Sequence, residues 1–269
     1  MKYFKLLSRS TIQRINRRKI RGLTPYYVNG FESRLETAIW QLSKCVNSRK
    51  IIDIGCGRDL HMSLIWAIKY GKPSIAYDVS RLADLDTINF TIKQLNGSEI
   101  KYLSDLSQYN ISYKVCSSIG LINDDFDAAV STASFEHIQE EQIEGLVNEV
   151  YKRLPIGGVF CANIDYRDHW SYIYNIPAWN FYTLSNFAFR LINNDKMFQN
   201  RLRHSDFQTW LLNNGFEKVD EMLSYFDELP EDIIFSNRFR RYTRDSLKIS
   251  SALISYRKTH NESLHRTIN

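Results

Sequence analysis

The sequence predicts an α/β fold, a doubly wound and mostly parallel seven-stranded sheet with helices on both faces. Apolar runs of strand length alternate with segments of helical periodicity, which is the pattern of parallel strands joined by right-handed helical crossovers. The first run, KIIDIGCG at 50–57, passes from a strand into two closely spaced glycines. The next run, SIAYD, ends in Asp78, 25 residues after Asp53. Open sheets of this kind bind ligands where such strands end.

Each element follows from a local pattern. Helices are expected where apolar residues recur at helical spacing, at 31–46, 60–70, 82–95, 140–153 and 204–214. The first of these helices is expected to cover the entrance to the ligand site, and Gly215 is expected to end the last one. Short apolar runs bounded by turn residues predict strands at 50–54, 74–78, 113–116, 126–130, 157–164, 216–224 and 249–257.

The composition indicates a single domain with extensions. With 269 residues, of which 43% are hydrophobic, the chain can bury one sizeable core, and a second catalytic domain does not fit. The cysteines are far apart and form no C-x-x-C pair, so neither a zinc site nor a disulfide framework is expected, and the cytoplasm is the expected location. The spacing of the histidines predicts no metal site. The four cysteines are Cys45, Cys56, Cys116 and Cys161.

The first 30 residues form a basic arm, followed by the domain at 31–257 and a polar tail at 258–269. Two interpretations of the arm stay open: a solvated or packed extension, and an amphipathic helix resting on an anionic membrane surface, which would be the inner face of the membrane. The rest of the chain holds 27 basic against 30 acidic residues, so a nucleic-acid partner is not expected. No secretory signal is expected. The arm's basic residues are Lys2, Lys5, Arg9, Arg14, Arg17, Arg18, Lys19 and Arg21.

The glycine run indicates the kind of ligand. Gly55 and Gly57 let a ligand approach the backbone, and a carboxylate at Asp78 can accept hydrogen bonds from both hydroxyls of a ribose. A dinucleotide site usually has a third glycine, but Asp59 stands near its place. An acid at position 53 suits a ligand with a cationic amino-acid part better than a diphosphate, which favours S-adenosylmethionine. A tight turn without a ligand is the alternative.

Two further segments extend this pattern into a family resemblance. They are FDAAVSTASFEHI at 126–138 and EVYKRLPIGGVFCANID at 149–165. In this order and spacing, the chain resembles class I S-adenosylmethionine-dependent methyltransferases over residues 31–257, which implies their Rossmann-like fold with an antiparallel last strand. The segments IDYRDHW at 164–170 and QNRLRHSDFQTWLLNNGFEKV at 199–219 resemble methyltransferase-11-like proteins, in the subset associated with bacterial glycan biosynthesis.

The resemblance implies a cofactor site spread over four strand ends. Gly55 and Gly57 would approach the methionine part, Asp78 would hold the ribose, and Val79 would lie against the adenine. A serine after the third strand would face the adenine edge. The expected cofactor-binding residues are Asp53, Gly55, Cys56, Gly57, Asp78, Val79, Ser117, Ser118 and Ser131.

The loops after strands four and five hold the candidates for chemistry. A neutral hydroxyl acceptor must lose its proton during methyl transfer, and a histidine is the best-matched base. His169 is expected to act with Asp168 as the group that orients its ring, while His137 is a catalytic residue or a helix cap. Residues 166–203 are expected to form an aromatic lid or acceptor insertion. The expected acceptor-binding residues are Glu136, Arg167, Arg201 and Arg203, although each arginine has the alternative of a surface charge.

Taken together, these patterns predict an O-methyltransferase that acts on a sugar of a glycan or of a lipid-linked glycan precursor. Methylation of a small metabolite, quinone or lipid is a second possibility, and a catalytically silent nucleoside-binding protein is a third. A nicotinamide-dependent oxidoreductase is disfavoured because the third glycine is missing.

Overall fold

The structure is a computed structural model that describes residues 25–194 and 198–259. The basic residues of the N-terminal arm and nearly all of the C-terminal tail lie outside the described residues, so the membrane-binding expectation concerns a part that is not described. Seven strands form one sheet: β1 (Ile51–Ile54), β2 (Ser74–Asp78), β3 (Ile111–Val115), β4 (Ala128–Thr132), β5 (Val159–Asp165), β6 (Phe216–Tyr225) and β7 (Ile249–Lys258).

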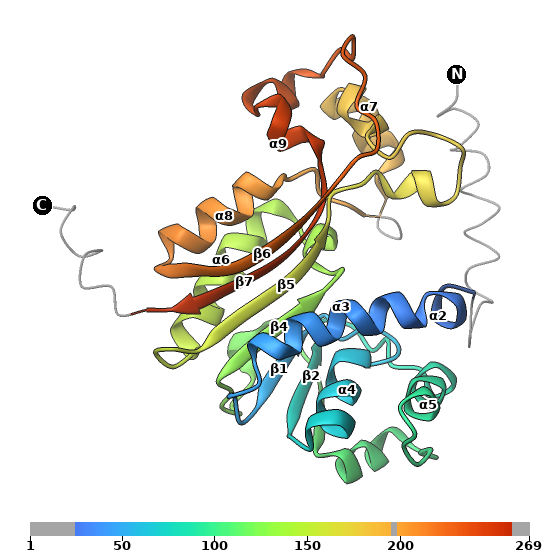
Figure 1. Ribbon diagram of the computed structural model, residues 1–269, viewed down its shortest axis with the longest axis vertical. Coiled ribbons are helices and arrows are strands. Elements are labelled where there is room, and N and C mark those ends of the chain that lie inside the picture. Colours follow the sequence, from blue (N-terminus) through green and yellow to red (C-terminus); the bar gives the residue numbers. More distant parts are fainter. Residues whose placement is uncertain (1–24, 195–197, 260–269) are drawn as a thin grey trace, which may run out of the picture.

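The strand order β3-β2-β1-β4-β5-β7-β6 confirms the predicted sheet (Figure 1). Strands β1 to β5 are parallel, and β7 runs antiparallel between β5 and β6, as the family resemblance implied. The chain order reverses between β1 and β4, which lie side by side at the centre of the sheet. In an open α/β sheet, this reversal leaves a crevice at the carboxyl ends of the strands.

Strand β4 begins two residues later than the sequence predicted. The carboxylate of Asp127 accepts hydrogen bonds from the backbone N–H groups of Arg49 and Lys50, and its own N–H donates to the Lys50 carbonyl. Phe126 is buried before the strand begins, which is why an apolar run at 126–130 resembled the whole strand. The other predicted strands differ from the observed ones by at most two residues at either end.

Helices cover both faces of the sheet (Figure 1). On one face lie α2 (Pro25–Asn29), α3 (Phe31–Lys44), α4 (His61–Tyr70) and α5 (Leu85–Gln94), and on the other α6 (Glu140–Arg153) and α8 (His204–Asn213). The side chain of Asp84 accepts from the Thr87 N–H and starts α5, so this helix begins three residues after the predicted position. Short 3-10 turns are η1 (Leu103–Tyr109), η2 (Ile119–Leu121), η3 (Phe135–His137), η4 (His169–Tyr172), η5 (Asn180–Thr183) and η6 (Asn237–Arg241).

A separate aromatic layer lies beyond the carboxyl end of β5 and the amino end of β7, where α7 (Asn186–Ile192) and α9 (Arg244–Lys248) are seen in Figure 1. We call the described residues of its two segments, 166–203 (without 195–197) and 226–248, the cap. Only the first was expected from the sequence; the second is the connection from β6 to β7. The cap has its own buried core, formed by Trp170, Phe181, Tyr182, Phe189, Ile192, Phe239 and Leu247.

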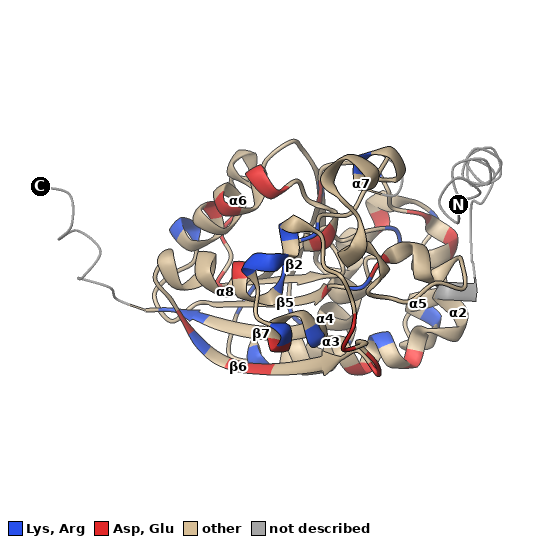
Figure 2. Cartoon of the chain, turned by 90° about the horizontal axis from the view of Figure 1, so that it is seen from above, with Lys and Arg blue, Asp and Glu red and all other residues tan. Residues whose placement is uncertain are grey.

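Basic and acidic residues both occur along α6 and along the edge strand β6 (Figure 2). Among the described residues, no helix is both long enough and apolar enough to cross a membrane. The sequence has an uncharged stretch from His169 to Phe189. In the structure this stretch forms η4, η5 and the first part of α7, all in the segment that precedes α8.

Candidate functional site

A cleft of about 2090 Å³ opens at the carboxyl ends of the parallel strands, below the cap. It is lined by the loops after β1, β2, β3, β4 and β5, and by the first helices of the described chain. Most of the residues that the sequence singled out line this one cleft. They are Asp53, Gly55, Cys56, Gly57, Asp78, Val79, Ser117, Ser118, Glu136, His137, Arg167 and His169.

The two glycines of the first loop are required for different reasons. Gly55 has a φ of +72°, and a Cβ there would lie 2.4 Å from the Ser134 hydroxyl oxygen. That hydroxyl donates to the Gly55 carbonyl, which joins the loops after β1 and β4. Gly57 has a φ of +65°, and a Cβ there would meet no atom nearer than 4.0 Å. The first glycine therefore serves packing, while the second leaves open space in the cleft.

Asp53 lies at the base of this loop and is almost fully buried. The hydroxyl of Ser63 donates to its carboxylate at 3.1 Å. Burial raises the pKa of Asp53 to about 7, against the effect of the hydrogen bond from Ser63. The carboxyl group is thus poised to change its charge near neutral pH, and a cationic ligand group in the cleft would favour the ionised form.

Asp78 ends β2 with its carboxylate at the edge of the cleft. One oxygen accepts from the Ser80 N–H at 3.0 Å and the other from the Gly57 N–H at 3.3 Å. Two carboxylate oxygens offer about four acceptor positions, so this side chain can accept two more hydrogen bonds. Val79 beside it is 64% exposed and lines the cleft with Ile119, giving an apolar wall next to the acid.

The acid that stands near the place of the third glycine has a structural partner. Asp59 forms an ion pair with Arg34 of α3, with 2.5 Å between carboxylate oxygen and guanidinium nitrogen. Both side chains are largely buried and line the cleft. This ion pair connects α3 to the loop that follows the two glycines. The helix therefore lies at the entrance to the cleft, where the sequence predicted it.

On the β4 and β5 side of the cleft, three ligand-type side chains lie together. Glu136 and His137 belong to η3 after β4, and His169 begins η4 after β5. One ligand atom from each of the three lies within 4.8 Å of the other two. The ring centroids of the two histidines are 4.9 Å apart. We call this group the Glu-His-His cluster.

The electrostatic surroundings of the cluster are uneven. Burial, and then the charge of Asp165, raise the pKa of Glu136 well above its ordinary value. Burial acts in the same direction on Asp165, but His169 and Arg167 outweigh it and hold the pKa of Asp165 below its usual range. The hydroxyl of Tyr172 also donates to Asp165. One carboxyl group thus favours its neutral form beside another that stays charged.

Asp168 does not orient the ring of His169, contrary to the sequence-based prediction. Its carboxylate accepts from the backbone N–H of Trp170 at 3.0 Å and caps η4. The carboxylate beside the ring is Asp165, four residues earlier, with 3.5 Å between its oxygen and His169 Nε2. Asp168 is engaged by the backbone of the 3-10 turn that it caps, so the carboxylate at the end of β5, Asp165, is the one found beside the imidazole.

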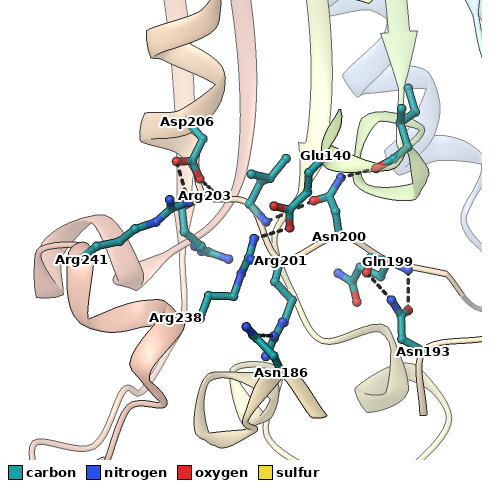
Figure 3. A network of polar contacts seen from close by, with 12 residues as sticks. Glu140, Asn186, Asn193, Gln199, Asn200, Arg201, Arg203, Asp206, Arg238 and Arg241 are labelled. Atoms are coloured by element: carbon teal, nitrogen blue, oxygen red, sulfur yellow. Dashed lines mark hydrogen bonds and ion pairs between the residues drawn. The ribbon is translucent and has the colours of Figure 1, made fainter. Parts of the chain in front are cut away.

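Three more predicted residues lie outside the cleft lining. Ser131 is fully buried and donates to the Ile54 carbonyl at 2.8 Å, which joins β4 to β1. Arg201 donates to the Leu184 carbonyl at 2.8 Å and to the side chain of Asn186 (Figure 3). Arg203 donates to the Tyr166 carbonyl at 2.8 Å and to the Ile249 carbonyl. Both guanidinium groups donate to backbone carbonyls of the chain itself. In the structure these two arginines therefore hold the cap together and do not face the cleft.

Other residues of the cleft escaped the sequence-based prediction. Asp165 is the last residue of the apolar run VFCANID, just as Asp78 is the last residue of SIAYD. This position at the end of a strand is a sequence signal by which Asp165 could have been found. Ser134 and Arg34 carried no such signal, because their roles depend on contacts with distant loops. The cap and the end of β6 contribute an aromatic rim formed by Tyr172, Trp179, Tyr225 and Phe226.

No known protein family and no curated protein matches the chain. Solved structures do share its architecture, and each of the three named here has a TM-score of 0.53. They are a candidate methyltransferase of Bacillus halodurans, at 15% identity over 85% of this chain and 100% of the other, geranyl diphosphate C-methyltransferase of Streptomyces coelicolor, at 16% over 88% and 85%, and an O-methyltransferase family protein of Burkholderia thailandensis, at 10% over 88% and 58%.

The chain has the methyltransferase fold. At 10–16% identity, the likeness lies in the arrangement of strands and helices. The chemistry of this chain therefore has to be argued from its own cleft.

Proposed function

We propose that this protein is an S-adenosylmethionine-dependent methyltransferase. The observation that carries the proposal is that Asp78 and the open loop at Gly57 face the same cleft as the Glu-His-His cluster. One end of the cleft offers acceptors for a ribose diol beside an apolar wall for a base. The other end offers side chains that can take a proton.

The residues present fit the proposed cofactor. Asp78 has acceptor positions left for two ribose hydroxyls, and exposed Val79 provides a surface for the adenine. Gly57 leaves room for the methionine part, and Asp53 supplies a carboxyl that a positive charge would ionise. The Streptomyces coelicolor enzyme, which shares this fold, was solved in complex with S-adenosyl-L-homocysteine, and this supports the proposed cofactor.

When bound, the cofactor supplies a methyl group on a positively charged sulfur. The chain's part is to align the acceptor, exclude water and remove the acceptor's proton. His169, held beside charged Asp165, and His137, at a ring distance of 4.9 Å, are the proposed proton acceptors for a hydroxyl group. Arg167 makes three hydrogen bonds to Asp165, one from its backbone N–H and two from its guanidinium group, and keeps that carboxylate in place.

The acceptor that we propose is a sugar of a glycan or of a lipid-linked glycan precursor. Aromatic side chains at the rim, Tyr172, Trp179 and Tyr225, offer flat apolar faces, while Asn163 and Asp165 offer hydrogen-bonding groups further in. Sugar rings present both kinds of surface. We propose a cytoplasmic location, with the basic arm at the membrane that would carry a lipid-linked acceptor. Methylation of a small apolar metabolite is the second candidate, because Ile173, Met222 and Leu223 line the same rim.

Calorimetry tests the cofactor site. S-adenosylhomocysteine should bind the wild type with a micromolar Kd, about −8 kcal/mol, whereas NAD should not bind. Asp78→Asn should weaken that binding at least about tenfold, because each lost hydrogen bond to a charged group is worth about 1.5–3 kcal/mol. Asp86→Asn is the matched control, since Asp86 is exposed on α5. A folded wild type without affinity for S-adenosylhomocysteine would remove the proposal.

Transfer of a labelled methyl group to candidate glycans tests the reaction. His169→Ala should lose turnover and keep its affinity for S-adenosylhomocysteine. Equal turnover of wild type, His169→Ala and His137→Ala would end the assignment of these imidazoles to the chemistry.

A further inference from the structure

The Glu-His-His cluster brings together three side chains of the types that bind metal ions. Glu136 and His137 come from the loop after β4, while His169 comes from the loop after β5. Their ligand atoms lie within 4.8 Å of one another, close enough to surround one ion. The spacing of histidines along the sequence predicted no metal site, because this group forms only where two loops 32 residues apart converge.

Glu136 gives an independent reason to look for a ligand. Its side chain is 2% exposed and lines the cleft, yet neither carboxylate oxygen has a hydrogen-bond partner within the described residues. Buried polar groups are nearly always hydrogen-bonded, and a buried carboxylate without a partner is costly. A cation held between the three side chains would supply the missing partner.

The two imidazoles are held by their surroundings. His137 Nδ1 lies 2.7 Å from the Phe198 carbonyl, and a carbonyl only accepts, so the ring proton is on Nδ1. Nε2 of His137 therefore carries the electron pair that binds a metal. A carbonyl behind a histidine in this way is a usual partner of metal-binding rings. The ring of His169 has Asp165 at 3.5 Å and Tyr172 at a centroid distance of 5.5 Å.

We propose that Glu136, His137 and His169 bind a divalent transition-metal cation at the acceptor end of the cleft. Two imidazoles and one carboxylate suit Mn²⁺, Fe²⁺, Co²⁺ or Zn²⁺ better than Mg²⁺ or Ca²⁺, which prefer oxygen ligands. Three protein ligands leave positions for an oxygen of the substrate. The ion's role rests on the proposed function, whereas its binding does not.

In that role, the cation would bind the acceptor's hydroxyl oxygen and lower the pKa of that hydroxyl, whose proton would pass to water. The resulting oxygen forms a bond to the methyl carbon of the cofactor. The carbon–sulfur bond breaks, and sulfur takes its electron pair as a neutral thioether. With the ion bound, the imidazoles would act as its ligands, and this route would replace the direct transfer of the proton to His169 or His137.

Metal binding is measured directly on the full, tag-free chain after treatment with a chelator. Calorimetry with Zn²⁺ and Mn²⁺, and absorption spectra with Co²⁺, should show one site with a micromolar or lower Kd. Mg²⁺ should bind at least about tenfold more weakly than Zn²⁺. Glu136→Gln and His137→Ala should each weaken Zn²⁺ binding about 100-fold or more, because loss of a supporting residue alone costs about 10–100-fold. Glu144→Gln, on the exposed side of α6, should leave it unchanged.

His137→Ala keeps the test decisive if the buried Glu136 variant does not fold, since His137 is exposed. Absence of a stoichiometric site in the wild type, or unchanged Zn²⁺ binding in His137→Ala, would overturn the inference. Binding of S-adenosylhomocysteine is measured on the same samples. Cofactor binding without metal binding would reject this site alone, whereas metal binding without cofactor binding would reject the proposed function and leave the site.

Discussion

At the scale of single residues, Asp53 combines a structural and a functional demand. Asp53 is buried near the carboxyl end of β1, where water does not reach it. It also lines the cleft, which is open to a ligand. Burial raises its pKa to about 7 from 3.8, and Ser63 satisfies one of its oxygens. Burial therefore favours the protonated form of Asp53, and a cationic ligand in the cleft would favour the ionised form.

The pKa of Asp53 predicts a specific loss of stability with rising pH. Because the folded-state pKa lies above the unfolded value, the contribution of this group is complete below about pH 4 and is lost as the pH rises through 7. Between pH 5 and 8, the wild type should lose about 3 kcal/mol of unfolding free energy relative to Asp53→Asn. Urea unfolding of both proteins across this range measures the difference.

Asp86→Asn serves as the control for this titration, because an exposed carboxylate on α5 should leave the pH profile parallel to that of the wild type. A parallel profile for Asp53→Asn as well would show that Asp53 titrates as an ordinary surface acid.

At the scale of elements, residues 198–203, the last part of the first cap segment, contact the loop after β4 and the start of β7. Asn200, which is labelled in Figure 3, donates to the carbonyls of Phe135 and Ile138 at 2.8 and 2.9 Å, and these two residues flank Glu136 and His137 in the chain. Arg203 is fully buried, lies between the rings of Tyr166 and Tyr182, and reaches the start of β7 through the Ile249 carbonyl. This segment thus positions the loop that carries Glu136 and His137, two of the three members of the Glu-His-His cluster.

Arg203→Met should destabilise the fold rather than alter acceptor binding. The change keeps most of the side-chain volume but leaves the Tyr166 and Ile249 carbonyls without their donor, at about 1–3 kcal/mol for each unsatisfied group. Urea unfolding should show a loss of about 2–5 kcal/mol, and Arg240→Met, on the exposed side of η6, should stay within about 0.5 kcal/mol of wild type. Unchanged stability together with a raised KM for an anionic acceptor would return Arg203 to the acceptor-binding role that the sequence suggested.

The sequence predicted those features that depend on local pattern. Strands β1 and β2, their terminal acids Asp53 and Asp78, and the glycines between them follow from apolar runs and backbone requirements. Arg203 could not be separated from a surface arginine, because burial is decided by elements that meet only in the folded chain. For the same reason, the sequence could not show that the carboxylate beside the His169 ring is Asp165 and not Asp168, the residue directly before His169.

At the scale of the whole molecule, the cleft lies between a sheet and a cap with separate cores. The cap is nevertheless tied to the sheet layer from both of its segments: the Tyr166 N–H donates to the Ser250 carbonyl of β7 at 2.9 Å, and the Tyr242 hydroxyl donates to the Asp206 carboxylate of α8 at 2.7 Å. Each tie closes a contact between segments more than 20 residues apart. The cap therefore depends on the sheet, although its core is its own.

Phe239→Ala should weaken the sheet as much as it weakens the cap. Phe239 is fully buried among Phe181 and Tyr182, so its loss should cost about 3–5 kcal/mol. Because these hydrogen bonds join the cap to β7 and α8, the molecule should unfold as one cooperative unit, and hydrogen exchange across a urea series should show the same loss for peptides of η6 and of β4. Phe187→Ala, at a 70% exposed position on α7, is the control and should change neither. A loss confined to the cap peptides would instead show that the cap opens independently over the cleft.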